Sequence, residues 1–175
     1  MRILAAQALS TRRPDLLPLR VEHAEEMAAV LSDPALHTFT GGAPDTARAL
    51  RSRCRRMTAG SPDPATSWLN WVIRLRDESC LPGTVQATVG PAVHGPIAEI
   101  AWVVGAPWQG KGIAVEAARG LVDWLSLQPV HTVIARDECN DPQVVTADFR
   151  PLRTVRRGRS GFPGCPSRCR SFGGW

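Results

Sequence analysis

The chain has 175 residues, 43% of them hydrophobic and 21% charged, which suits one folded domain with a single core. No apolar run approaches the roughly 20 residues needed to span a bilayer, and the N-terminal residues do not resemble a signal peptide, so we expect a cytoplasmic protein. Removing the seven arginines of residues 150–175 from the formal net charge of +5 leaves −2 for residues 1–149, so the basic excess lies in the C-terminal segment alone.

The first part of the chain predicts a strand followed by two helices. Residues 16–20 read as a short strand. In residues 21–33 apolar side chains recur at helical spacing until Asp-Pro ends the pattern. A second helix is expected over residues 44–57, with Pro44 in its first turn. Residues 37–44 between the helices are a loop by their Gly and Pro content.

The middle of the chain changes to the period of strands. Apolar and polar side chains alternate in residues 67–75 and 83–89, which predicts two strands. Residues 97–105 form a nearly continuous apolar run, which predicts a strand buried on both faces. A helix is expected from residue 112 on, and a short strand over residues 131–135. The apolar stripe of this helix consists of Ile113, Ala117, Leu121, Trp124 and Leu125.

The turn after residues 97–105 has the composition of a phosphate-binding loop. Gly105-x-x-x-x-Gly110-Lys111-Gly112 stops one residue short of a P-loop, which would end in Gly-Lys-Ser or Gly-Lys-Thr. Backbone N–H groups and the positive end of a helix dipole converge at such a turn, so phosphate is a suitable ligand. A P-loop needs the hydroxyl after its lysine to hold Mg²⁺, and Gly112 has none, which disfavours ATP. A plain strand-to-helix turn is the alternative interpretation.

The same residues resemble a known family. Gln109-Gly110-Lys111-Gly112-Ile113-Ala114 matches the Gln/Arg-x-x-Gly-x-Gly/Ala signature of the GNAT N-acetyltransferase superfamily. Residues 98–125 look like its central strand, pyrophosphate loop and following helix, and are most similar to the branch related to ribosomal-protein N-terminal acetyltransferases. The resemblance covers residues 15–140. It implies an α/β (α+β) fold with a mixed, mostly antiparallel central sheet flanked by helices.

The resemblance implies that the ligand is acetyl-CoA, used as a co-substrate without a metal ion. The loop residues whose backbone N–H groups would bind its pyrophosphate are Gln109, Gly110, Lys111, Gly112, Ile113 and Ala114. In the family the preceding strand carries a bulge and splays from its neighbour, so Trp102, Val103 and Val104 would offer backbone groups to the pantetheine arm. Asn140 occupies the position of an asparagine that commonly faces this arm. The Lys111 side chain would add charge near a phosphate or stay solvated.

Acetyl transfer requires a neutral amine, a polarised thioester carbonyl and a proton for the leaving thiolate. Glu99 is the candidate base, because it is a carboxylate within the apolar run, where burial would raise its pKa. The alternative is a structural glutamate bonded to a neighbouring strand or loop. The family often uses a tyrosine as the proton donor, but this chain has no Tyr. Cys139 or water would have to replace it, and the sequence selects neither.

From about residue 145 on, the sequence loses every helical or strand period. Residues 146–175 are rich in Arg, Gly and Pro, whereas the family continues there with a helix and two more strands. We therefore divide the chain into an acetyltransferase-like domain, residues 1–145, and an atypical tail, and expect the C-terminal strands to be missing. Disorder of the tail, or a shift of reading frame near residues 143–147, would explain the change. The five cysteines lack zinc-binding spacing, so no metal site is expected.

Three hypotheses for function follow from these features. The first is an N-acetyltransferase that acts on the amine of a peptide N-terminus or of a small molecule. The second is a degenerate family member that binds acetyl-CoA without catalysis. The third is a nucleic-acid binder that uses the Arg-rich tail, although no known binding motif accompanies that tail. The expected partners are an amine acceptor of unknown identity and a second copy of the chain in a homodimer. Nucleic acid is less expected than these two, and no membrane is expected.

Overall fold

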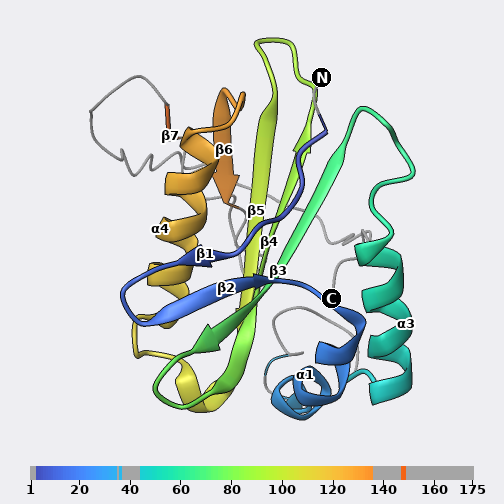
Figure 1. Ribbon diagram of the computed structural model, residues 1–175, viewed down its shortest axis with the longest axis vertical. Helices are drawn as coiled ribbons and strands as arrows, with labels where there is room; N and C mark the ends of the chain where they lie inside the picture. The colour runs from blue at the N-terminus through green and yellow to red at the C-terminus, as the bar shows by residue number, and fades with distance from the viewer. Residues whose placement is uncertain (1–2, 35, 37–43, 136–146, 149–175) are drawn as a thin grey trace, which may run out of the picture.

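The computed structural model of the protein describes residues 3–34, 36, 44–135 and 147–148, which form one mixed sheet with helices on both faces (Figure 1). Over these described residues the sheet has seven strands, in the order β1-β2-β3-β4-β5-β6-β7. Their bounds are β1 Leu9–Ser10, β2 Pro14–Pro18, β3 Ser67–Leu75, β4 Cys80–Gly90, β5 Ile97–Val104, β6 Thr132–Ala135 and β7 Ala147–Asp148. Neighbouring strands are antiparallel except β5 and β6, which are parallel. The predicted mixed, mostly antiparallel sheet is confirmed.

Alternating apolar side chains explain the central strands β3 and β4. The odd-numbered residues are buried over positions 69–75 of β3 and positions 85–89 of β4. The register places Trp71 directly opposite Val85, so the apolar side chains of both strands fall on the same face. A shift of register by one residue would move this whole set to the other face, so burial fixes the pairing.

Helices cover both faces of the sheet. Those that the structure describes are α1 (Ala24–Val30), preceded by the 3-10 helix η1 (Val21–His23), α3 (Ala47–Thr58) and α4 (Ile113–Ser126). α4 packs on the face that carries the buried odd-numbered residues of β3, and α1 and α3 pack on the opposite face around Val72 (Figure 1). The predicted stripe of α4 is buried in full: Ile113, Ala117, Leu121, Trp124 and Leu125.

Several element boundaries differ from the prediction: the first helix ends at Val30 instead of residue 33, and β4 begins at Cys80 instead of residue 83. β2 spans Pro14–Pro18, two residues before the expected range. α3 begins at Ala47 instead of including Pro44 in its first turn, because Thr46 is the N-cap and its Oγ1 accepts a hydrogen bond from the N–H of Ala49 at 3.2 Å. β1 was not predicted, because two residues are too few to show an alternating pattern.

The expectation that residues 97–105 form a strand buried on both faces is wrong. β5 buries Ala98, Ile100 and Val104 among the core residues that α4 contacts, whereas Glu99 is exposed. On the opposite face, α1 and α3 make their main sheet contacts with β4 and β3. The Glu99 face of β5 therefore lies beside this helical cover instead of under it.

β7 lies in the segment for which no strand was expected. The backbone of Ala147 pairs with Val133 and that of Asp148 with Thr132, which adds one short antiparallel strand to β6. The rest of the predicted tail and the loop of residues 37–43 lie outside the described residues. None of the helices in the described part of the chain is long and apolar enough to cross a bilayer.

Candidate functional site

The loop from β5 to α4 is built around two glycines with left-handed backbone. β5 ends at Val104, the 3-10 helix η2 spans Ala106–Trp108, and Gly112 is the N-cap of α4. The φ angle is 73° at Gly110 and 75° at Gly112, a region that residues with a Cβ rarely adopt. A Cβ added at Gly110 would meet no atom within 4 Å, so the backbone there borders open space.

This loop presents a row of backbone N–H groups at the start of α4. The helical bonds of α4 begin with the N–H of Glu116, which donates to the Gly112 carbonyl at 3.1 Å. No described residue accepts a hydrogen bond from the N–H groups of residues 110–115, and no side chain caps the helix. These donors coincide with the positive end of the helix dipole, so they are arranged to bind an anion such as a diphosphate.

Gln109 closes the loop instead of adding to this row. Its Nε2 donates to the carbonyl of Val104, the last residue of β5, at 3.0 Å. Its backbone N–H donates to the carbonyl of Ala106 at 3.2 Å, within η2. The N–H of Gln109, predicted to contact pyrophosphate, is thus already bonded, and the available donors begin at Gly110.

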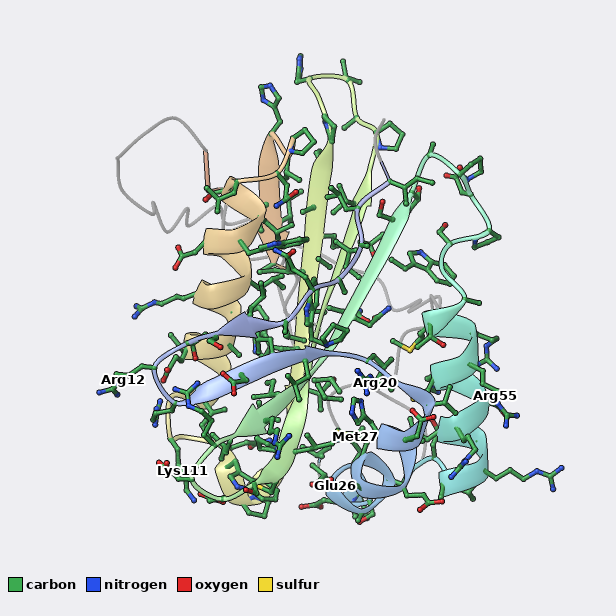
Figure 2. The ribbon with its side chains drawn as sticks, viewed as in Figure 1. Arg12, Arg20, Glu26, Met27, Arg55 and Lys111 are labelled. Atoms are coloured by element: carbon green, nitrogen blue, oxygen red, sulfur yellow. The ribbon has the colours of Figure 1, made fainter. Side chains whose placement is uncertain are left out.

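Trp108 ties the loop to the turn between β3 and β4. Its indole Nε1 donates to Glu78 Oε2 at 3.0 Å. This hydrogen bond is the main reason why the pKa of Glu78 lies below its ordinary value, and the positive charge of Lys111 adds to the effect. Gly105 is needed here, because an added Cβ would approach the Trp108 ring to 3.2 Å and Val30 Cγ1 to 2.8 Å. The Lys111 side chain is exposed at this end of the molecule (Figure 2).

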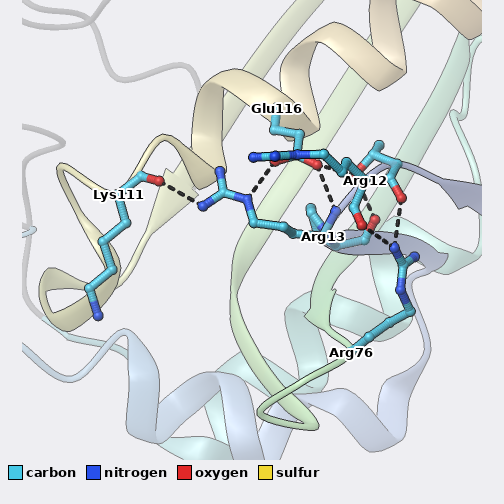
Figure 3. Close-up of polar contacts among 7 residues, drawn as sticks. Arg12, Arg13, Arg76, Lys111 and Glu116 are labelled. Atoms are coloured by element: carbon cyan, nitrogen blue, oxygen red, sulfur yellow. Dashed lines mark hydrogen bonds and ion pairs between the residues drawn. The ribbon is translucent and has the colours of Figure 1, made fainter.

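The turn between β1 and β2 is bonded to the first turn of α4 through Glu116 (Figure 3). Glu116 Oε1 accepts from the backbone N–H of Arg13 at 2.7 Å and from Thr11 Oγ1 at 3.1 Å. Glu116 Oε2 accepts from Arg13 Nε at 2.7 Å. Partial burial acts to raise the pKa of Glu116, but the hydrogen bonds from Arg13 and Thr11 outweigh it and lower that pKa. Sequence reasoning missed this cluster, because Thr11 and Glu116 are 105 positions apart and no local pattern links them.

The residues predicted to contact the pantetheine arm lie in the part of β5 that pairs with only one described strand. β6 pairs with β5 up to Ile100, whereas Trp102, Val103 and Val104 pair with β4 alone among the described strands. The β4–β5 register is continuous, so the bulge implied for β5 is not found. Val103 turns its carbonyl toward β4, since a Cβ on Gly83 would lie 2.1 Å from this oxygen.

The backbone groups at this end of β5 do not all point in the same direction. Backbone groups alternate in direction along an antiparallel strand, so Trp102 and Val104 face away from β4 while Val103 faces toward it. The carbonyl of Val104, which accepts from Gln109, agrees with this parity. The backbone groups of Trp102 and Val104 are therefore directed away from β4 and those of Val103 toward it, and contact of the three residues with the pantetheine arm stays a prediction.

Glu99 lies on the open face of the sheet and not in its core. It pairs with Thr88 of β4, and Thr88 pairs in turn with Trp68 of β3. Glu99 and Thr88 are exposed, and Trp68 is 39% exposed. The burial predicted for Glu99 is wrong. Its carboxylate is instead accessible to a molecule that approaches from solvent, on a surface that includes an indole ring two strands away.

Two other predicted participants lie outside the described residues: Asn140, the candidate for the pantetheine arm, and Cys139, a candidate proton donor. In the part of the chain that the structure describes, no group of three or more His, Cys, Asp and Glu side chains could hold a metal ion.

The sequence matches a family of known enzymes. Residues 13–146 match the family described as "Acetyltransferase (GNAT) domain". This match spans well over half of the chain, and the sheet and the strand–loop–helix unit agree with it. The chain therefore belongs to the GNAT acetyltransferase family. No curated protein matches the sequence.

Several solved structures share the fold. A GNAT-family acetyltransferase from Bacillus anthracis is 19% identical with a TM-score of 0.62, over 74% of this chain and 72% of that one. An acetyl transferase from Salmonella typhimurium that modifies the N-terminal serine of 50S ribosomal subunit protein L7/L12 is 11% identical with a TM-score of 0.61, over 74% of each chain. The Microcin C7 self immunity acetyltransferase MccE, in complex with acetyl-CoA and AMP, is 18% identical with a TM-score of 0.57, over 71% of this chain and 69% of that one.

Proposed function

We propose that the protein is an acetyl-CoA-dependent N-acetyltransferase whose acceptor is the amine of a peptide N-terminus or of a small molecule. The observation that carries the proposal is the row of N–H groups of residues 110–115, which donate to no described residue, at the start of α4 in a GNAT-family chain. One structure of similar fold contains acetyl-CoA, and another belongs to an enzyme that modifies an N-terminal serine. Both support the extension of amine acetylation to this chain.

The chemistry of the loop suits a diphosphate held by backbone donors. Gly110 and Gly112 leave the backbone accessible, and the helix dipole of α4 adds positive potential. Gly112 offers no hydroxyl of the kind that a P-loop uses to hold Mg²⁺. The exposed Lys111 ammonium adds a positive charge at the same loop (Figure 2). We therefore assign the loop to the pyrophosphate of acetyl-CoA and not to ATP.

Acetyl-CoA would supply the acetyl group as a thioester: a C–N bond forms at its carbonyl carbon as the C–S bond breaks. The amine nitrogen loses one proton and the sulfur gains one, from water or from Cys139, so an amide and a free thiol result. The loop and the β5 strand hold acetyl-CoA in place, and once the amine is bound beside the thioester the attack becomes effectively unimolecular. Glu99 accepts the proton that leaves the amine.

The position of Glu99 favours a water-mediated transfer. Strands rise about 3.3 Å per residue, so Glu99 and Trp102 are about 10 Å apart along β5. A carboxylate at that distance from Trp102, where the thioester is expected, reaches an amine through a water molecule more readily than directly. Exposure of Glu99 on the sheet face is compatible with this role, because the intervening water can enter from solvent.

The test is acetylation of defined acceptors by the full chain. Acetyl-CoA is incubated with peptides that have a free N-terminal serine or methionine, with the same peptides blocked at the N-terminus, and with a short diamine. Release of the CoA thiol and the mass gain of one acetyl group are measured. We expect acetylation of a free amine and none of the blocked peptides. Saturable acetyl-CoA binding with no acetylation of any amine would instead support a degenerate, non-catalytic member of the family.

A further inference from the structure

Arg13, in the turn between β1 and β2, is hydrogen-bonded to the loop between β5 and α4. Its Nη1 donates to the carbonyl of Lys111 at 3.0 Å, and its Nε donates to Glu116 Oε2 at 2.7 Å (Figure 3). The Arg13 side chain is 37% exposed and that of Glu116 is 17% exposed, so the pair is partly shielded from solvent. One guanidinium thus joins the loop before α4 to the first turn of α4 itself.

The contact with Lys111 controls the direction of a neighbouring donor. The peptide bond is planar and trans, so the carbonyl of Lys111 and the N–H of Gly112 point in opposite directions. When Arg13 holds the Lys111 carbonyl, the N–H of Gly112 is directed away from the β1–β2 turn. Both glycines of the loop lack the side chain that would otherwise restrict their backbone. The orientation of this donor therefore depends on the outside restraint that Arg13 supplies.

The β1–β2 turn is itself held in place by hydrogen bonds from Arg76. Arg76 follows directly on β3; its Nη2 donates to the carbonyl of Thr11 at 2.8 Å and also to that of Arg12, and its Nη1 donates to Asp15 Oδ1 at 2.5 Å. Thr11 Oγ1 additionally donates to Glu116 Oε1 at 3.1 Å. The chain of bonds runs from β3 through the turn to α4 and the loop, which makes the turn a rigid support.

We propose that Arg13 is a positioning residue for acetyl-CoA, which acts by bridging Glu116 and the Lys111 carbonyl and not by adding charge. This inference rests on the proposed function. The guanidinium charge is already paired with Glu116 at 2.7 Å, which limits its attraction for a phosphate. A lysine keeps the charge but has no planar fork to reach two acceptors at fixed geometry, so Arg13→Lys separates the two roles.

The experiment compares Arg13→Lys and Arg13→Gln with Arg12→Gln as the matched control. Arg12 lies in the same turn and is exposed, and its guanidinium has no hydrogen bond or ion pair with a described residue. Arg12→Gln therefore removes one positive charge without touching the bridge. Acetyl-CoA dissociation constants are measured by calorimetry on the full chain, and hydrogen exchange of residues 110–115 is measured without ligand. Circular dichroism confirms that each variant folds; Arg13→Lys keeps an ion pair with Glu116 and so keeps the turn attached.

We expect both Arg13 variants to weaken acetyl-CoA binding about tenfold, which corresponds to about 1.4 kcal/mol, and Arg12→Gln to change it less than twofold. Exchange in residues 110–115 should accelerate in both Arg13 variants and stay unchanged in Arg12→Gln. Wild-type affinity and exchange in Arg13→Lys, with Arg12→Gln as weak as Arg13→Gln, would show that charge alone acts and would overturn the inference while leaving the proposed function intact. Absence of acetyl-CoA binding by the wild-type chain would overturn both.

Discussion

At Gly112 the backbone passes from loop to helix with a φ of 75°, and an added Cβ would lie 3.4 Å from Arg13 Nη2. We expect Gly112→Ala to lower the free energy of unfolding by about 1–2 kcal/mol, because left-handed backbone is strained for a residue with a Cβ. Gly60→Ala is the control, since Gly60 has a φ of 87° and open space around it, away from the loop. Urea unfolding should show similar losses for both variants, and only Gly112→Ala should weaken acetyl-CoA binding; equal affinities would contradict the assignment of the loop.

Glu99 supplies the test of catalysis at the level of a single residue. Glu99→Gln should lower kcat about 10²-fold at saturating acetyl-CoA, because the amide cannot accept the amine proton, while the affinity for acetyl-CoA stays unchanged. The deficit should shrink as the pH rises above about 8, where an α-amine is neutral without help. Thr88→Val, which alters the neighbouring position on β4, is the control for local packing. A deficit independent of pH would argue for a structural role of Glu99.

Thr46 is the N-cap of helix α3 and stabilises its first turn. Thr46 Oγ1 accepts the hydrogen bond of the Ala49 N–H, so Thr46→Ala should destabilise the protein by about 1 kcal/mol in urea unfolding. Ser52→Ala, at an exposed position within the same helix, is the comparison, and we expect no loss there. A loss at Ser52 as large as that at Thr46 would show that the cap is not the source of the effect.

The long elements could be predicted from the sequence, and the contacts between elements could not. The alternation in β3 and β4 and the stripe of α4 record which face is buried, so their periods are visible in the chain itself. The exposure of the Glu99 face of β5 depends on where α1 and α3 pack, and the sequence of β5 alone does not reveal that placement. β1 and β7 are too short to show a period. The bridge from Arg13 to Glu116 joins residues 103 positions apart, so no local signal marks it.

The ion pair between Arg13 and Glu116 makes the free energy of unfolding of the whole molecule depend on pH. The pKa of Glu116 is lower in the folded protein than the ordinary value of about 4.3 that it regains on unfolding. The carboxylate therefore contributes stability that is fully present above the pKa of the unfolded state and is lost as the pH falls through the lower pKa of the folded state. The difference in free energy of unfolding between the wild type and Glu116→Gln should be constant from pH 5 to 7 and shrink below pH 4. A difference that does not change with pH would contradict the ion pair.

The central claim is that the loop before α4 binds acetyl-CoA, and the most direct measurement is calorimetric titration of the full, folded chain with acetyl-CoA and, in parallel, with Mg-ATP. The N–H groups of residues 110–115 and the missing hydroxyl at Gly112 predict saturable binding of acetyl-CoA and none of Mg-ATP. No saturable acetyl-CoA binding would contradict the account. Binding of Mg-ATP in its place would show that the loop is a P-loop variant despite Gly112.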